Sequence, residues 1–213
     1  MFDKITELFQ SGPDVPDLIA VLDLEEWYLS LGDGQREKLH QYSTSVGIGV
    51  TSSGDVNEFN MLEQSVSSTS QTAQKYLQNV GQTAATEKDY EFAEQVLHVA
   101  LEFEDGSASS THFTYNELID VYYKQRDERG DAIERCIEYC KRDIELADDF
   151  IDEFGEVPRI PSFKRLAIIY EKQDRYEEAL DICDRALEIG TTDGTKGGFE
   201  GRKERIRKKM KDG

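Results

Sequence analysis

Residues 163–190 read FKRLAIIYEKQDRYEEALDICDRALEIG, two amphipathic patterns on either side of a short polar turn. In the first half, apolar residues recur at spacings of three and four, at Phe163, Leu166, Ala167, Ile169 and Tyr170. After the turn at 173–175 the same spacing returns, at Tyr176, Ala179, Leu180, Cys183, Ala186, Leu187 and Ile189. This spacing is typical of a helix with one buried face, and Gly190 is a good helix stop. The stretch therefore predicts two antiparallel helices.

The sizes of several residues in this hairpin carry a resemblance to a known family. Small and large side chains alternate in the pattern of a tetratricopeptide repeat, at Leu166, Ala167, Tyr170, Tyr176, Ala179, Cys183 and Ala186. The resemblance implies that Ala167 and Ala179 meet where the two helices cross. The end of the chain, with this repeat before it, is also similar to the ends of small repeat proteins of microbes and their viruses.

Two earlier segments repeat the pattern. Residues 76–104 place Gly81 where the quoted hairpin has Ala167, and Ala93 where it has Ala179, with a turn at 87–89. Residues 111–154 form a less regular hairpin, whose second helix is expected to continue unbroken to Phe154. With 162–190 these make three hairpins. Each hairpin exposes an apolar face that only a neighbouring hairpin can cover, so the three are expected to stack. The predicted fold is therefore all-α, a short α-solenoid over residues 76–190.

The flanking regions are expected to cap this array. Residues 1–75 predict a short helix at 1–10, one apolar helix from Pro16 to Leu31 that carries the core residue Trp27, and a helical segment at 35–42. Residues 43–55 are rich in glycine and serine and predict a loop, after which a helical period returns from Val56. Residues 191–213 predict a glycine-rich turn and a basic capping helix with Phe199, Ile206 and Met210 on its apolar face.

The family resemblance implies a function, namely binding of a peptide or protein segment in the groove formed by the first helix of each hairpin. Carried over position by position, the groove residues are Gln78, Gln82, Asn116, Asp120, Tyr123, Lys124, Lys164, Ile168, Glu171 and Lys172. Tyr123 and Ile168 would anchor apolar groups, and the lysines would pair with carboxylates of the partner. This predicts a non-catalytic scaffold whose partner is a protein or peptide.

An alternative function rests on the basic end of the chain. Residues 196–213 hold eight bases and three acids in a chain of net charge −19. The basic side chains are Arg202, Lys203, Arg205, Arg207, Lys208 and Lys209. They would allow a regulatory or assembly role in contact with nucleic acid or a larger complex, although the acidic remainder of the chain repels nucleic acid. An acidic partner protein, including another copy of this chain, is a further alternative.

Composition argues against other classes. No stretch approaches the roughly 20 apolar residues of a membrane span, and no secretory signal is visible, so a cytoplasmic location is expected. Cys136, Cys140 and Cys183 are expected to be buried thiols. Residues 46–50 alternate glycine with Val and Ile but lack the remainder of a phosphate-binding motif. The histidines at 40, 98 and 112 belong to no metal or nucleophile motif, so we expect no enzyme, no metal site and no cofactor.

Overall fold

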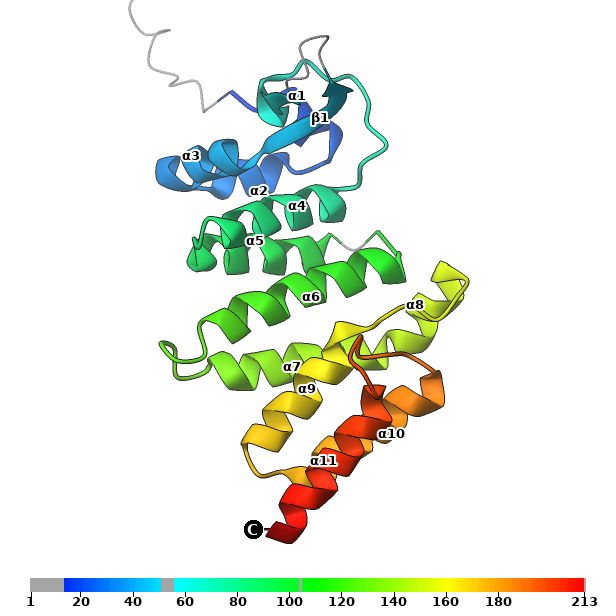
Figure 1. Cartoon of the computed structure of the whole chain (residues 1–213). Coiled ribbons are helices and arrows are strands. Elements are labelled where there is room, and N and C mark those ends of the chain that lie inside the picture. The colour runs from blue at the N-terminus through cyan, green and yellow to red at the C-terminus, as the bar shows by residue number, and fades with distance from the viewer. Residues whose placement is uncertain (1–13, 51–55, 104, 213) are drawn as a thin grey trace, which may run out of the picture.

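The chain is a layered array of helices, as described by a computed structural model for residues 14–50, 56–103 and 105–212 (Figure 1). The helices are α1 (Asp17–Val21), α2 (Glu25–Ser30), α3 (Asp33–Tyr42), α4 (Ala73–Thr86), α5 (Tyr90–Glu102), α6 (Ala108–Lys124), α7 (Ala132–Glu145), α8 (Ala147–Phe154), α9 (Pro161–Lys172), α10 (Tyr176–Ile189) and α11 (Gly198–Asp212). Figure 1 shows them layered in chain order, from the N-terminal helices to α11. The predicted all-α class is confirmed.

Consecutive helices pack in pairs in the larger part of the chain. The strongest helix contacts join α4 to α5, α6 to α7 and α9 to α10, while α6 also touches α4 and α5, and α9 touches α7. The turns of the first and third pairs each contain one non-glycine residue with positive φ, Lys88 at 65° and Asp174 at 58°. Ala93, Ala167 and Ala179 are fully buried, as small residues at close helix contacts should be.

The closest helix approach in the α4–α5 pair lies at Gly81. A Cβ atom placed on this residue would lie 2.5 Å from Cγ and 2.7 Å from Cδ2 of Leu97, which is itself fully buried. Such distances are shorter than any van der Waals contact, so a methyl group here forces Leu97 or the helix axes to move. Glycine is therefore required at this position by packing and not by its backbone freedom.

Gly81→Ala is expected to lower the free energy of unfolding by about 1–2 kcal/mol, because overpacking costs more than alanine's better helix propensity returns. The matched control is Gly34→Ala in α3, where a Cβ would meet nothing within 4 Å. That variant should be as stable as the parent or slightly more stable. Urea denaturation of the two variants checks the expectation, and equal stability of both would contradict it.

The helix predicted to run unbroken to Phe154 is divided at Leu146 into α7 and α8, which corrects the prediction. The division accompanies a contact of α8 with the start of α6. Oε2 of Glu153 accepts hydrogen bonds from the backbone N–H groups of Ala108 at 2.6 Å and Ser109 at 3.3 Å. Hydrogen bonds from Ser109 and Ser107 hold the pKa of Glu153 below its ordinary value. The carboxylate thus caps the N-terminus of α6, where a negative charge is favourable.

The N-terminal region differs most from expectation. The single helix predicted from Pro16 to Leu31 is two helices, α1 and α2, because Asp23 has a left-handed backbone (φ 56°) between them. Trp27 is partly buried against the core and Tyr28 is buried. The helical segment at 35–42 is confirmed as part of α3. The predicted helix at 1–10 lies outside the described residues.

The predicted loop at 43–55 is wrong over 44–50, while residues 51–55 lie outside the described residues, and the helical period predicted from Val56 is wrong over 56–60. Residues Thr44–Val50 form β1, which pairs antiparallel with β2 (Val56–Asn60), and Thr44 lies opposite Asn60. A short 3₁₀ helix, η1 (Met61–Glu63), follows β2. The β-branched residues of β1 alternate with small ones, a pattern that favours an extended chain once a partner strand is available.

The helix α11 covers the end of the array (Figure 1). Phe199 and Ile206 of α11 are buried, and the Phe199 ring packs edge-on against Phe163 of α9, with 6.5 Å between the ring centres. Met210, predicted on the same face, is exposed. Among the described residues, no helix combines the length and the apolar character needed to cross a membrane. The three cysteines are free and buried, as expected, and burial raises the pKa of Cys183 to about 11.

Candidate binding cleft between α6 and α9

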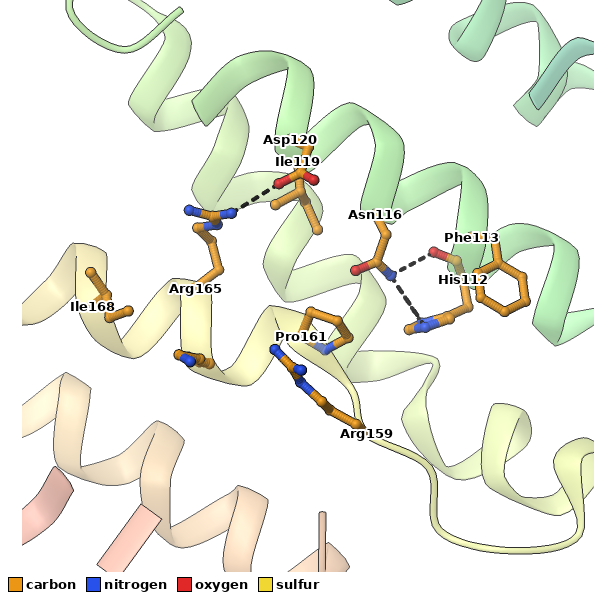
Figure 2. Close-up of a pocket in the computed structure, with 10 residues that line it drawn as sticks. His112, Phe113, Asn116, Ile119, Asp120, Arg159, Pro161, Arg165 and Ile168 are labelled. Atoms are coloured by element: carbon orange, nitrogen blue, oxygen red, sulfur yellow. Dashed lines mark hydrogen bonds and ion pairs between the residues drawn. The ribbon is translucent and has the colours of Figure 1, made fainter. Parts of the chain in front are cut away.

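A cleft of about 500 Å³ separates the first helices of the second and third helix pairs, α6 and α9 (Figure 2). Its lining residues are His112, Phe113, Asn116, Ile119, Asp120, Arg159, Pro161, Lys164, Arg165 and Ile168. Four of the ten residues predicted for the groove are among them: Asn116, Asp120, Lys164 and Ile168. The cleft lies within the range of volumes typical of ligand sites.

The back wall of the cleft is a buried polar network centred on Asp143 of α7. The side chains of His112 and Asp143 are 4% and 0% exposed, and Nδ1 of His112 lies 2.7 Å from Oδ1 of Asp143. The other carboxylate oxygen, Oδ2, accepts hydrogen bonds from Ser162 Oγ and, at 3.4 Å, from Asn116 Nδ2. Phe150 of α8 stacks on the imidazole at 4.0 Å. One carboxylate therefore ties α6 and α9 to α7.

The order of these groups does not match nucleophilic catalysis. In a serine triad the imidazole lies between the serine and the carboxylate and takes the serine proton. Here the carboxylate lies between them, since Ser162 and His112 both donate to Asp143. Ser162 donates to the carboxylate directly and not to an imidazole, and its side chain is fully buried. The network is suited to holding three helices together and to shaping one wall of the cleft.

Three cationic side chains line the cleft. Arg165 pairs with Asp120 at 2.9 Å, as Figure 2 shows. Nζ of Lys164 donates to the backbone carbonyl of Asp193 at 3.2 Å. Within the described part of the chain, neither Lys164 nor Arg159 has a carboxylate within 4.0 Å. Two positive charges in the cleft are thus left without a paired carboxylate.

A second, smaller cavity of about 230 Å³ lies farther along the same helices. Tyr123, Arg126, Ile133, Ile169 and Lys172 are among the lining residues. The guanidinium of Arg165 lies 3.8 Å from the centre of the Tyr123 ring, and that of Arg126 lies 4.5 Å from it. Lys172 donates to the Tyr123 hydroxyl at 3.4 Å. Tyr123 and Lys172 are both predicted groove residues, but cations already cover the tyrosine ring.

The other predicted groove residues lie elsewhere. Gln78 is buried and accepts a hydrogen bond from Lys75, and Gln82 donates to Glu117 of α6 at 2.6 Å. Burial raises the pKa of Glu117. Lys124 is exposed at the end of α6, outside both cavities. Glu171 faces α11, where it pairs with Arg202 and Lys209.

Half of the predicted basic tail is engaged within the chain. Arg202 is buried between Glu171 and Asp193, each 3.4 Å away. Lys203 is buried and pairs with Asp184 of α10, and Lys209 pairs with Glu171 at 2.7 Å. The other three residues, Arg205, Arg207 and Lys208, are exposed. The ion pairs of Arg202, Lys203 and Lys209 attach α11 to the helices that it covers.

Sequence reasoning missed His112, Phe113, Arg159 and Arg165. The signal for His112 was present, because it precedes Asn116 and Asp120 by one and two helical turns and so shares their face. Arg159 gave no such signal, since it lies in the extended segment before α9, whose position only the packed structure shows. Among the described residues, no group of three or more His, Cys, Asp or Glu side chains is arranged to hold a metal ion.

Comparison with known proteins adds one relative. The chain is 28% identical over 194 residues to a protein of Aquifex aeolicus (strain VF5) described as an uncharacterized protein. The match covers 88% of this chain and 92% of the relative. No family model matches the chain. The similarity spans the helices on both sides of the cleft.

Proposed function

We propose that this protein is a non-catalytic interaction module, a short solenoid of tetratricopeptide-like hairpins that binds an acidic peptide segment in the cleft between α6 and α9. Both helices are the first of their pairs, which is where the family resemblance places a partner. The segment would continue past Arg165 toward Tyr123 and Lys172. The proposal includes a cytoplasmic location, which buried free thiols support.

The observation that carries this proposal is a line of cations without carboxylate partners in a strongly acidic chain. Arg159, Lys164 and Lys172 follow α9 and the segment before it, and the described residues place no carboxylate within 4.0 Å of any of them. The chain as a whole carries a net charge of −19. Unpaired positive charges concentrated in a cleft attract an anionic partner and exclude a cationic one.

Apolar groups beside these cations supply the second component of binding. Ile168 lines the cleft and is partly exposed, and Phe113 at its other end is 42% exposed. Burial of such side chains contributes roughly 25 cal/mol per Å² of apolar surface removed from water. A partner segment that alternates acidic and apolar residues would use both components.

The basic face of α11 is a weaker candidate for the main contact. Three of its six predicted cations pair with Glu171, Asp193 and Asp184, and a nucleic acid would have to break those pairs to use them. Arg205, Arg207 and Lys208 would remain, against the repulsion of the acidic chain. The cleft therefore accounts for the charge pattern better.

The test uses a labelled peptide that alternates glutamate with leucine and a second one with lysine in place of glutamate. We expect the acidic peptide to bind and the basic one not to bind, as measured by fluorescence anisotropy. The double variant Lys164→Glu/Lys172→Glu should weaken binding of the acidic peptide at least tenfold, which equals about 1.4 kcal/mol. Added salt should weaken it as well, because these charges are partly exposed.

The matched control is the double variant Arg207→Glu/Lys208→Glu, which makes the same charge change at two exposed positions of α11 outside both cavities. It should leave the affinity for the acidic peptide within about twofold. Equal losses from both variants would attribute binding to overall charge, and equal binding of both peptides would attribute it to apolar contact alone. Either result would contradict the proposal.

A further inference from the structure

Arg159 and Lys164 lie against the same short piece of backbone. The Arg159 guanidinium lies against Gly194, with Nη1 3.2 Å from where a Cβ of that glycine would be. Lys164 donates to the carbonyl of the preceding residue, Asp193, at 3.2 Å. Gly194 has a positive φ of 69°, so the turn that brings the two cations together favours glycine twice, for its conformation and for the space it leaves.

Neither contact pairs a cation with a carboxylate. A carbonyl oxygen and a glycine backbone carry no net charge. The carboxylate of Asp193 is near enough for the Lys164 charge to lower its pKa, but its ion pair is with Arg202. The third cation of the cleft, Arg165, is balanced by Asp120. The lining therefore includes two cations without an ion pair, both lying against residues 193–194. Figure 2 shows Arg159 close to Pro161 at the start of α9.

An aromatic surface lies across the cleft from them. Phe113 is 42% exposed although neighbours hold its ring, since it packs edge-on against His112 at 5.2 Å and Phe150 at 6.1 Å. Pro161 also lines the cleft and is exposed. An exposed ring that its neighbours keep in place loses little freedom when a flat apolar group packs on it.

The charge of the site distinguishes between anions. A single carboxylate would neutralise one of the two cations and leave the other unpaired beside an apolar wall. A phosphomonoester carries about −1.5 to −2 charges at pH 7 and has three acceptor oxygens. It can take a forked hydrogen bond from an arginine and a further one from a lysine at the same time.

We propose, as a refinement that rests on the proposed function, that the cleft binds a phosphomonoester on an apolar group, with the phosphoryl group between Arg159 and Lys164 and the apolar group against Phe113. A phosphorylated side chain of a peptide and a small free phosphomonoester share this chemistry. The acidic peptide of the proposed function would then be bound most tightly when it is phosphorylated.

The first experiment titrates the full chain with phenyl phosphate, inorganic phosphate and phenol, and follows binding by isothermal titration calorimetry. Phenyl phosphate should bind at least tenfold more tightly than inorganic phosphate, and phenol should not bind measurably. Tighter binding of phenol than of inorganic phosphate, or binding of none of the three, would overturn the inference.

Two variants test the two halves of the site. Arg159→Gln should weaken phenyl phosphate and inorganic phosphate alike, by about tenfold each. Phe113→Ala should weaken only phenyl phosphate, bringing it close to the affinity of inorganic phosphate. Lys208→Gln on α11 is the control and should change neither. The inference fails if Arg159→Gln has no greater effect than the control, and thermal unfolding of each variant verifies that the fold persists.

Further titrations distinguish a phosphorylated peptide from a small free phosphomonoester as the ligand. They also distinguish this inference from the proposed function. A glutamate–leucine peptide with one phosphotyrosine should compete with phenyl phosphate and bind at least tenfold more tightly than its unphosphorylated form if the natural ligand is a peptide. Binding of phenyl phosphate with no gain for the phosphopeptide identifies a small phosphomonoester. Binding of the acidic peptide without any phosphoryl preference refutes this inference and leaves the proposed function intact.

Discussion

Asp143→Ala is expected to lower the free energy of unfolding by about 3–5 kcal/mol, the largest loss that one substitution outside the apolar core should cause here. The carboxylate is fully buried and accepts hydrogen bonds from His112, Ser162 and Asn116. Removing it takes the acceptor from the buried His112 and Ser162 side chains, while Asn116 keeps its hydrogen bond to the backbone carbonyl of His112, and it opens a cavity between α6, α7 and α9. The donors lie on two helices, so the loss affects the contacts of α7 with both.

Thermal and urea unfolding measure this effect. For a chain of this length, a loss of this size corresponds to a fall in Tm of roughly 10 °C. The matched control is Asp148→Ala, which removes the same group from α8, where Asp148 is 72% exposed and pairs with Arg185 at 3.0 Å. Exposed ion pairs contribute at most about 1 kcal/mol, so the control should unfold near the parent. Comparable losses in both variants would show that the buried network does not stabilise the fold.

Arg202→Ala should cost about 3 kcal/mol, because it removes the cation that two acids share beneath α11. The Arg202 side chain is 8% exposed, its partner Asp193 is 0% exposed, and its Nε is buried without a hydrogen-bond partner. Two hydrogen bonds from Thr195 to Asp193 would survive and limit the loss. Arg207→Ala, on the exposed side of the same helix, is the control and should change stability by less than about 0.5 kcal/mol.

The same variant should change how stability depends on pH. Burial raises the pKa of Asp193, but hydrogen bonds from Thr195 and the charges of Arg202 and Lys164 outweigh it and hold the pKa below its ordinary value. A depressed folded-state pKa stabilises the fold above the pKa of the unfolded chain, and this contribution disappears as the pH falls through the folded value. Without Arg202 the acid-side loss of stability should become smaller. An unchanged acid limb in urea unfolding from pH 7 to pH 3 would show that Arg202 does not stabilise the Asp193 carboxylate.

The helices that the sequence predicts best are those with strong local signals. The quoted stretch lies on α9 and α10 almost residue for residue, because apolar spacing, a polar turn and a terminal Gly190 all indicate the same hairpin. Where expectations failed, a local signal was weak or misleading. The apolar run from Pro16 to Leu31 has a helical period, yet the backbone at Asp23 turns left-handed and divides it.

Other failures depend on contacts between segments distant in sequence. Residues 44–50 form a strand only because 56–60 pair with them, and the glycines in that stretch indicated a loop. The division at Leu146 accompanies the contact that Glu153 makes with the start of α6, about 45 residues earlier in the chain. No spacing within residues 132–154 could indicate that contact.

In the candidate site, too, some residues were predictable from local spacing and others depended on tertiary contacts. Asn116, Asp120, Lys164 and Ile168 were predictable because helical periodicity assigns side chains to faces, and the two faces do meet across the cleft. Tyr123 was predicted as an open anchor, but three cations surround its ring. The network behind the cleft was not predictable, since Asp143 belongs to α7, which contributes no side chain to the expected groove.

By itself, the amino-acid sequence determined an all-α chain, the paired helices of its larger part, and the faces that they bury, because these follow from the order of apolar and polar residues over a few helical turns. Only the tertiary structure decided which charges are paired and which are free. It placed Arg202 between Glu171 and the buried Asp193, and it left Arg159 and Lys164 without an ion pair. The physical reason is that an ion pair depends on distances between side chains of separate helices, and these distances exist only once the helices have packed.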